Sequence, residues 1–163
     1  MVKILFICHG NICRSVSAQY IFEELLRRRG VAGVLADSVA TSREEIGNRI
    51  YPPMKAALGR MGVPVGDHRA RQMKAEDYEA YDLLIGMDRE NLYNMRRILG
   101  ADPEGKLHYL MEFAGRPGEA VEDPWYTREF DSCAAQIAEG CAGLLEHILN
   151  DPAFTGSASG AVL

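Results

Sequence analysis

The chain has 163 residues, of which 47% are hydrophobic and 25% charged, a composition typical of one globular domain with a substantial core. Its net charge of −5 excludes a general nucleic-acid binder, because no surplus of basic residues is present to neutralise phosphates. No apolar run reaches the roughly 18 residues of a membrane span, and the N-terminal apolar stretch is too short for a signal-peptide core. We therefore expect a cytoplasmic protein with no membrane partner.

The first half of the chain predicts two strands and two helices. Residues 2–7, VKILFI, form an apolar run typical of a strand that is buried on both faces. An amphipathic helix is expected over residues 15–30, and a second strand over residues 33–40. A further helix over residues 52–62 is opened by two prolines and closed by a glycine.

The second half continues the alternation. We expect, in order, a short polar helix, a strand, a helix, a fourth strand and a long amphipathic helix, over residues 74–81, 82–87, 88–99, 106–111 and 127–149. Strands that alternate with helices predict an α/β fold, in which helices cover a parallel sheet on both sides. This single domain is expected to span residues 1–151, with a flexible tail over residues 152–163.

Ligands of such a sheet bind beyond the carboxyl ends of the strands. The segments that should meet there are residues 8–15, 38–42, 87–91 and 112–126. None of the four cysteines has the spacing of a zinc ribbon or of a Cys-x-x-Cys redox motif, and we expect free thiols in a reducing compartment.

The segment CHGNICRS at residues 8–15 has the composition of an anion-binding loop. Arg14 and Ser15 stand where a helix should begin, and helix N-termini attract anions through their free N–H groups and partial positive charge. Gly10 permits a tight turn, and Asn11 tolerates the left-handed backbone that turns successive N–H groups inward. The guanidinium of Arg14 adds a planar set of donors for phosphate oxygens.

Cys8 faces the same loop, where the helix dipole and an arginine would stabilise a thiolate. Ser15 could donate a hydrogen bond to that sulfur, so that one loop would supply a nucleophile, an anion cradle and a charge stabiliser. The alternative is a buried core thiol at Cys8 and a solvated Arg14. The five residue types together at a strand-to-helix junction favour the functional interpretation. A Walker loop is excluded, because its Gly-Lys-Ser/Thr ending is absent.

Asp123, in VEDPWY, is the candidate acid for a leaving group. Pro124 restricts the backbone of Asp123, and Trp125 and Tyr126 could wall a cleft for a flat aromatic substrate. By itself an Asp-Pro pair is a weak signal, because most such pairs only start turns.

Together, ILFICHGNICRS and the distant EDPWY resemble the low-molecular-weight protein tyrosine phosphatases. The blocks DSVATS at 37–42, HRARQ at 68–72 and MDRENL at 87–92 follow in the family's order, and the resemblance runs from Lys3 to about Leu149. It implies a four-stranded parallel sheet flanked by helices on both sides, a doubly wound, flavodoxin-like three-layer sandwich. It implies no metal and no cofactor.

The resemblance also implies the chemical roles. Cys8 would attack the phosphate and become a cysteinyl-phosphate, while Arg14 holds the phosphate oxygens. Asp123 would protonate the departing phenol oxygen and then activate water. Ser15 would assist the sulfur, and Cys13 would be a redox partner that forms a reversible disulfide with Cys8.

Support of the loop is implied for three further residues. Asn11 would shape the loop through hydrogen bonds that involve Ser38 and His68, although His68 could equally be a histidine without a role. Asp88 matches a family aspartate that helps order the site, and a helix N-cap explains it equally well. The implied phosphate-binding loop also includes His9, Gly10, Ile12 and Cys13.

The chain departs from the family pattern in the loop and at the rim of the cleft. Val16 stands where the family has proline, and Glu44 where an aromatic wall residue is expected. With Glu45 it would make the rim acidic, which would disfavour acidic phosphopeptides. Tyr51 is a candidate for the missing ring. His9 occupies a variable position and either touches the substrate or faces solvent.

The leading hypothesis is a monomeric enzyme that hydrolyses phosphotyrosine in proteins and releases inorganic phosphate, with a tyrosine kinase among its candidate partners. Phosphoarginine phosphatases share the scaffold but tend to carry a small threonine at the position of Ile12. Arsenate reductases need mid-chain cysteines, and none lies between Cys13 and Cys133. A phosphate-binding or redox-sensing module with little turnover is the alternative from another class, but a pure binder has no need of Asp123.

Overall fold

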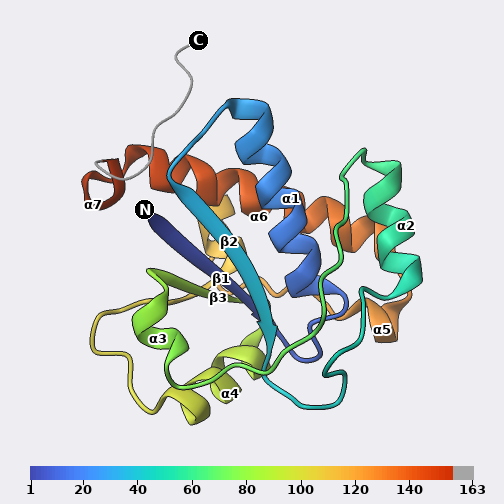
Figure 1. Ribbon diagram of the computed structural model, residues 1–163, viewed down its shortest axis with the longest axis horizontal. Coiled ribbons are helices and arrows are strands. Elements are labelled where there is room, and N and C mark those ends of the chain that lie inside the picture. The colour runs from blue at the N-terminus through green and yellow to red at the C-terminus, as the bar shows by residue number, and fades with distance from the viewer. Residues whose placement is uncertain (156–163) are drawn as a thin grey trace.

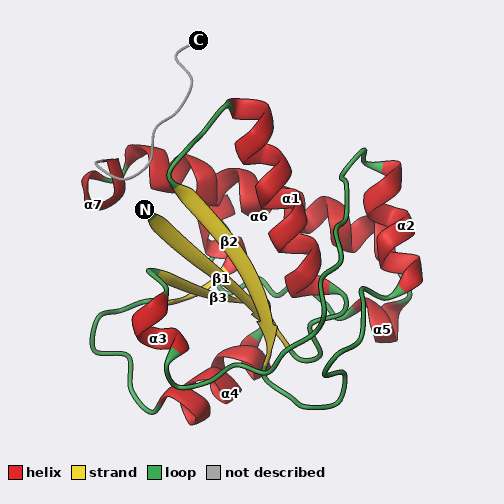
Figure 2. Cartoon of the chain, viewed as in Figure 1, coloured by secondary structure: helices red, strands yellow, loops and turns green. Residues whose placement is uncertain are grey.

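The computed structural model describes residues 1–155 and contains a four-stranded parallel sheet with helices on both faces (Figures 1 and 2). The strands, in the order β2-β1-β3-β4, are β1 (Val2–Cys8), β2 (Val34–Ala40), β3 (Leu83–Gly86) and β4 (Leu107–Tyr109). The helices are α1 (Arg14–Arg29), α2 (Pro52–Arg60), α3 (Asp77–Ala80), α4 (Arg89–Leu99), the 3-10 helix η1 (Leu110–Ala114), α5 (Pro124–Thr127), α6 (Phe130–Asn150) and α7 (Pro152–Thr155). The predicted fold class is confirmed.

The central strand β1 divides the core into two layers. Ile4 and Phe6 belong to the cluster under α1 and α6, whereas Leu5 and Ile7 belong to the cluster under α4. All four side chains are buried, as a strand covered on both faces requires. Each contributes about 1.5–3 kcal/mol by its removal from water. Figure 1 shows α1 and α6 on one side of the sheet and α3 and α4 on the other.

The strand order places β1 between β2 and β3, so that the chain leaves β1 at the point where the order reverses. Cys8 is the last residue of β1 and pairs with Ala40 of β2. Residues 9–13 therefore form a loop at the carboxyl edge of the sheet, immediately before the N-terminus of α1. Ligand sites in open parallel sheets lie at this kind of position.

Three predicted boundaries were wrong by two or three residues, and the first is the start of the short polar helix α3, which lies at Asp77 rather than at residue 74. The fourth strand ends at Tyr109 and passes into η1, because the Glu112 carboxylate accepts the Tyr109 N–H at 2.8 Å and closes a tight turn. The last long helix begins at Phe130 rather than at residue 127. Residues 124–127 form the separate helix α5, which ends at Arg128 in a left-handed conformation.

The end of the described chain is helical. Pro152–Thr155 forms α7, and Phe154 packs against the main core cluster, so these four residues differ from the tail expected there. The remainder of the predicted tail, residues 156–163, lies outside the described residues. None of the helices formed by residues 1–155 combines the length and the apolar character needed to cross a bilayer.

Candidate active site

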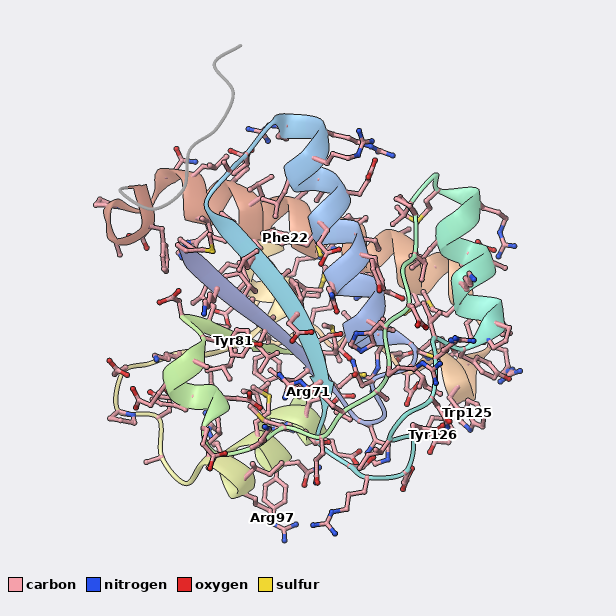
Figure 3. The ribbon with its side chains drawn as sticks, viewed as in Figure 1. Phe22, Arg71, Tyr81, Arg97, Trp125 and Tyr126 are labelled. Atoms are coloured by element: carbon pink, nitrogen blue, oxygen red, sulfur yellow. The ribbon has the colours of Figure 1, made fainter. Side chains whose placement is uncertain are left out.

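A pocket of about 150 Å³ opens at the carboxyl edge of the sheet. Three segments line it: the loop after β1, the loop after β2 and the start of α5. Its lining residues are Cys8, His9, Gly10, Ile12, Cys13, Arg14, Glu44, Glu45, Asp123, Trp125 and Tyr126. Trp125 and Tyr126, labelled in Figure 3, project from the α5 segment at the edge of the molecule. The structure thus brings most of the predicted site residues to one hollow.

The peptide groups of the loop are turned by hydrogen bonds from outside it. The carbonyls of Cys8, His9, Ile12 and Cys13 accept N–H groups of residues 41, 42, 51 and 17, at 2.8–3.1 Å. Because C=O and N–H point in opposite directions across a trans peptide, the following N–H groups are directed to the other side. Residues 9, 10, 13 and 14 carry these N–H groups and line the pocket, which gives the cradle its positive character.

The sulfur of Cys8 has three hydrogen-bond partners. Ser15 Oγ lies 3.0 Å from Cys8 Sγ, and the N–H groups of Asn11 and Ser15 donate to it at 3.3 and 3.4 Å. The side chain is buried, yet it forms part of the pocket wall. Two backbone N–H groups and one hydroxyl therefore converge on this sulfur.

Asn11 holds the loop in shape from behind. Its φ of 60° is in the left-handed region, as predicted. Its Nδ2 donates to Ser15 Oγ at 2.8 Å, and its Oδ1 lies 2.8 Å from Nε2 of His68. Ser38 Oγ lies 3.4 Å from the same histidine nitrogen. Burial lowers the pKa of His68, so a neutral ring donates from Nε2 to Asn11.

Arg14 is a buried guanidinium between two carboxylates. Its side chain is 3% exposed, and its Nη1 donates to Asp88 Oδ2 at 2.6 Å and to the Val121 carbonyl at 2.9 Å. Nη2 lies 3.5 Å from Asp123 Oδ2. Burial acts to lower the pKa of Arg14, but the charges of Cys8, Asp88 and Asp123 outweigh it and the pKa is raised. The cation is therefore permanent and fixed in direction.

Asp88 contacts both the start of α4 and Arg14. Its Oδ1 accepts the Asn91 N–H at 2.8 Å and caps α4, while its Oδ2 binds Arg14. The two carboxylate oxygens of Asp123 likewise have separate partners. Its Oδ1 caps α5 by accepting the Trp125 N–H at 3.0 Å, and its Oδ2 faces Arg14.

The rim differs in part from the prediction. His9 lines the pocket and its Nε2 lies 2.9 Å from Glu44 Oε2, so that a hydrogen bond joins two side chains of the rim. Tyr51 was expected to supply a missing cleft ring, but it is not among the lining residues. Its ring packs behind Trp125, 4.9 Å between centroids, and supports that wall from outside.

Burial raises the pKa of each of the remaining three cysteines. Burial, followed by the charge of Cys8, raises the pKa of Cys13. Burial raises the pKa of Cys133 to about 12, and burial also raises that of Cys141. These thiols stay protonated at neutral pH. Among residues 1–155, no group of three histidine, cysteine or acidic side chains could hold a metal ion.

Several supporting residues were not predicted. The Val121 carbonyl orients Arg14, and Gln19 Oε1 accepts the Ser38 hydroxyl at 2.7 Å. The N–H of Arg71 donates to Asn11 Oδ1 at 3.3 Å, and its guanidinium, labelled in Figure 3, contacts the Asp77 carboxylate at 3.3 Å. A backbone acceptor leaves no mark in a sequence, because any residue type supplies it.

Known proteins share this arrangement over nearly the whole chain. The family model described as low molecular weight phosphotyrosine protein phosphatase matches residues 3–153. The chain belongs to this family. Within the family, the low molecular weight protein-tyrosine-phosphatase YfkJ of Bacillus subtilis is 34% identical over 150 residues, which cover 91% of this chain and 96% of that protein. The crystal structure of YfkJ matches with a TM-score of 0.88 and 33% identity, covering 93% of this chain and 97% of that one.

One further relative and one further solved structure come from another organism, the fruit fly. Low molecular weight phosphotyrosine protein phosphatase 1 of Drosophila melanogaster is 31% identical over 151 residues, covering 90% of this chain and 97% of that protein. The crystal structure of DARP, a drosophila arginine phosphatase, matches with a TM-score of 0.82 and 29% identity, covering 92% of this chain and 99% of that one. The predicted family and phosphatase class are confirmed, and the family implies phosphoprotein substrates.

Proposed function

We propose that this protein hydrolyses phosphotyrosine in proteins through a cysteinyl-phosphate on Cys8. One observation carries the proposal: a sulfur with three hydrogen-bond partners stands at the base of a pocket whose loop N–H groups and Arg14 suit a dianion. A phosphate in that cradle would present its phosphorus to Cys8 Sγ. Positioning of this kind converts the reaction into an intramolecular one.

In the first step, the Cys8 thiolate attacks phosphorus, the S–P bond forms and the bond from phosphorus to the phenol oxygen breaks. Arg14 and the loop N–H groups stabilise the charge on the transferring phosphoryl oxygens. Asp123, in its protonated form, gives its proton to the departing oxygen. Its place at the mouth, with Oδ2 facing Arg14, suits a group that must reach the leaving group.

In the second step, the Asp123 carboxylate takes a proton from water, which attacks phosphorus and breaks the S–P bond. Inorganic phosphate leaves, and the sulfur regains its negative charge. Ser15 Oγ, 3.0 Å from Cys8 Sγ, donates to the departing thiolate and makes it a better leaving group. Asn11 and His68 hold Ser15 in place for both steps.

The pocket walls favour an aryl phosphate. Ile12 and Trp125 supply apolar and aromatic surface for a phenyl ring, and Tyr126 extends the wall at the mouth. Phosphoarginine is the second candidate substrate, because an arginine phosphatase is among the similar structures. The acidic side chains of Glu44 and Glu45 at the mouth could face a guanidinium.

The decisive comparison uses three peptides of one sequence, which differ only in carrying phosphotyrosine, phosphoarginine or phosphoserine. We expect phosphate release from the phosphotyrosine peptide to exceed the other two by at least about 100-fold in kcat/KM, a difference that needs about 2.7 kcal/mol. The Cys8→Ser variant is the control for chemistry at this site. Faster release from phosphoarginine would contradict the substrate assignment, and unchanged release by Cys8→Ser would contradict the nucleophile.

We further propose that the chain acts as a monomer in the cytoplasm, on tyrosine-phosphorylated proteins that include a kinase among the candidates. The four cysteines are unpaired and buried, which suits a reducing compartment. Sedimentation of the purified chain at increasing concentration tests the monomer. A dimer that persists at low concentration would contradict it.

A further inference from the structure

The short helix that carries Asp123 ends in a strained residue. Arg128 has a φ of 60°, a left-handed conformation that is uncommon outside glycine and persists only when the surroundings hold it. Its N–H donates to the Pro124 carbonyl at 2.9 Å and closes α5. A helix of four residues has little stability of its own, so contacts outside α5 must keep it in place.

The guanidinium of Arg128 supplies such contacts. It lies 5.5, 5.8 and 5.3 Å from the ring centroids of Tyr51, Trp125 and Phe130. Its Nη2 donates to Tyr51 Oη at 3.1 Å, and its Nη1 to the Trp125 carbonyl at 3.4 Å. Cation–π attraction to the three rings, together with the two hydrogen bonds, connects this one side chain to Tyr51, Trp125 and Phe130.

Tyr51 connects this cluster to the phosphate-binding loop. Its N–H donates to the Ile12 carbonyl at 2.8 Å, and its ring packs at a tilt against Trp125, with 4.9 Å between the centroids. A continuous path therefore runs from Ile12 through Tyr51 and Arg128 to α5. Asp123 begins that helix by accepting the Trp125 N–H.

Arg128 itself does not line the phosphate pocket. It lines a second hollow, between α2 and the start of α6, together with Phe130 and Arg60. Within residues 1–155 its guanidinium forms no ion pair with a carboxylate, unlike Arg14. Its contacts are thus directed at aromatic rings and at the α5 backbone, which suits a role in placing the wall rather than in binding substrate.

We propose that Arg128 is a positioning residue: by holding Trp125 and α5 against Tyr51, it fixes the distance from the proton of Asp123 to the leaving oxygen above the phosphate-binding loop. This inference rests on the proposed function. Proton transfer is sensitive to such placement, since a displacement of about 1 Å costs on the order of 100-fold in rate. The step from Cys8 to phosphorus depends less on α5, because other contacts fix the loop.

The test compares Arg128→Gln with Arg97→Gln. Arg97 is a matched control, because its guanidinium lies 5.9 Å from a single ring, that of Tyr93, and Figure 3 places it far from Trp125. A second variant, Arg128→Gly, also lacks the guanidinium. Glycine adopts the left-handed backbone without strain, so this variant is expected to fold. Arg128→Lys keeps the charge without the planar donors.

Each variant is assayed on aryl phosphates with good and with poor leaving groups. In the first step, measured as the release of phenol in a single turnover, we expect Arg128→Gln and Arg128→Gly to lose about 10-fold more rate on the poor leaving group, which needs the proton, and Arg128→Lys to recover part of it. Arg97→Gln should behave as the unmodified protein does. Equal losses on both substrates, or no loss, would overturn the inference.

Trp125, the single tryptophan of the chain, gives a second measurement that needs no turnover. We expect acrylamide to quench its fluorescence more strongly in Arg128→Gly than in the unmodified protein or in Arg97→Gln. Unchanged quenching would overturn the inference. If the unmodified protein hydrolysed no aryl phosphate at all, the proposed function would fail, while the quenching experiment would still report on the role of Arg128.

Discussion

The two halves of the site are held in different ways. Main-chain hydrogen bonds to neighbouring segments fix the loop that carries Cys8, and Asn11 and Ser15 are wholly buried within it. The segment that carries Asp123 is a four-residue helix whose side chains Trp125 and Tyr126 are 46% and 81% exposed. A nucleophile can be built into the core, whereas an acid must reach the leaving group of each substrate at the surface.

The charged groups of the loop and of the rim also differ in burial. Arg14 is a buried cation that two carboxylates and a carbonyl hold in one direction. At the rim, His9 and Glu44 form an exposed pair, and exposed pairs contribute little to stability. Changes in the loop should therefore abolish the chemistry for every substrate, and changes in the α5 segment should act according to the leaving group.

The largest effect is expected for Arg14→Lys. Lysine keeps the charge but lacks the planar donors that reach Asp88 and the Val121 carbonyl while also facing the phosphate. We expect kcat to fall by about 100- to 1,000-fold for good and poor leaving groups alike. Steady-state assays on two aryl phosphates measure this. A loss confined to poor leaving groups would contradict the assignment of Arg14 to the phosphoryl oxygens.

Asp123→Asn isolates the acid, because asparagine still caps α5 through its side-chain oxygen. We expect kcat on a poor leaving group to fall by about 100-fold or more, in the range of general acid catalysis. In the first step alone, measured as the burst of phenol, a good leaving group should react almost as in the unmodified protein. A burst that is slowed equally for both substrates would remove Asp123 as the acid.

A third prediction concerns oxidation in the loop. Peroxide should convert the Cys8 thiolate to a sulfenic acid, and the Cys13 thiol should then displace water to form a disulfide. Burial raises the pKa of Cys13, so that it waits as the protonated resolving thiol. Activity should return with a thiol reductant in the unmodified protein and largely fail to return in Cys13→Ala. Full recovery of Cys13→Ala would contradict this pairing.

The smallest effect is expected at His68. Burial lowers its pKa in the folded state, so between that pKa and the ordinary value near 6.5 the unfolded chain binds more protons than the folded one. Stability should therefore fall as the pH drops through this window, by less than about 1.4 kcal/mol per pH unit. His68→Asn should lack this contribution. Urea unfolding at several pH values measures it, and an identical pH dependence of stability in His68→Asn and in the unmodified protein would contradict the neutral, half-buried ring.

The sequence predicted the loop better than the rim for a physical reason. Residues 8–15 lie within one strand–loop–helix unit, so Cys8, Asn11 and Arg14 are brought together locally, whatever the rest of the chain does. Tyr51 depends on long-range packing against Trp125, and sequence spacing could not show that it lies behind the wall. The apolar run 106–111 was mistaken in part for strand, because apolarity alone does not separate a strand from a 3-10 turn.

The central claim, covalent transfer to Cys8, is tested most directly by trapping the intermediate. Asp123→Asn should form it quickly from an aryl phosphate with a good leaving group and hydrolyse it slowly, because the base for water is missing. After a rapid quench, we predict that mass spectrometry will find one phosphoryl group on the peptide that contains Cys8, at its sulfur. A phosphoryl group on any other residue, or continued turnover with Cys8 replaced by serine, would contradict the account.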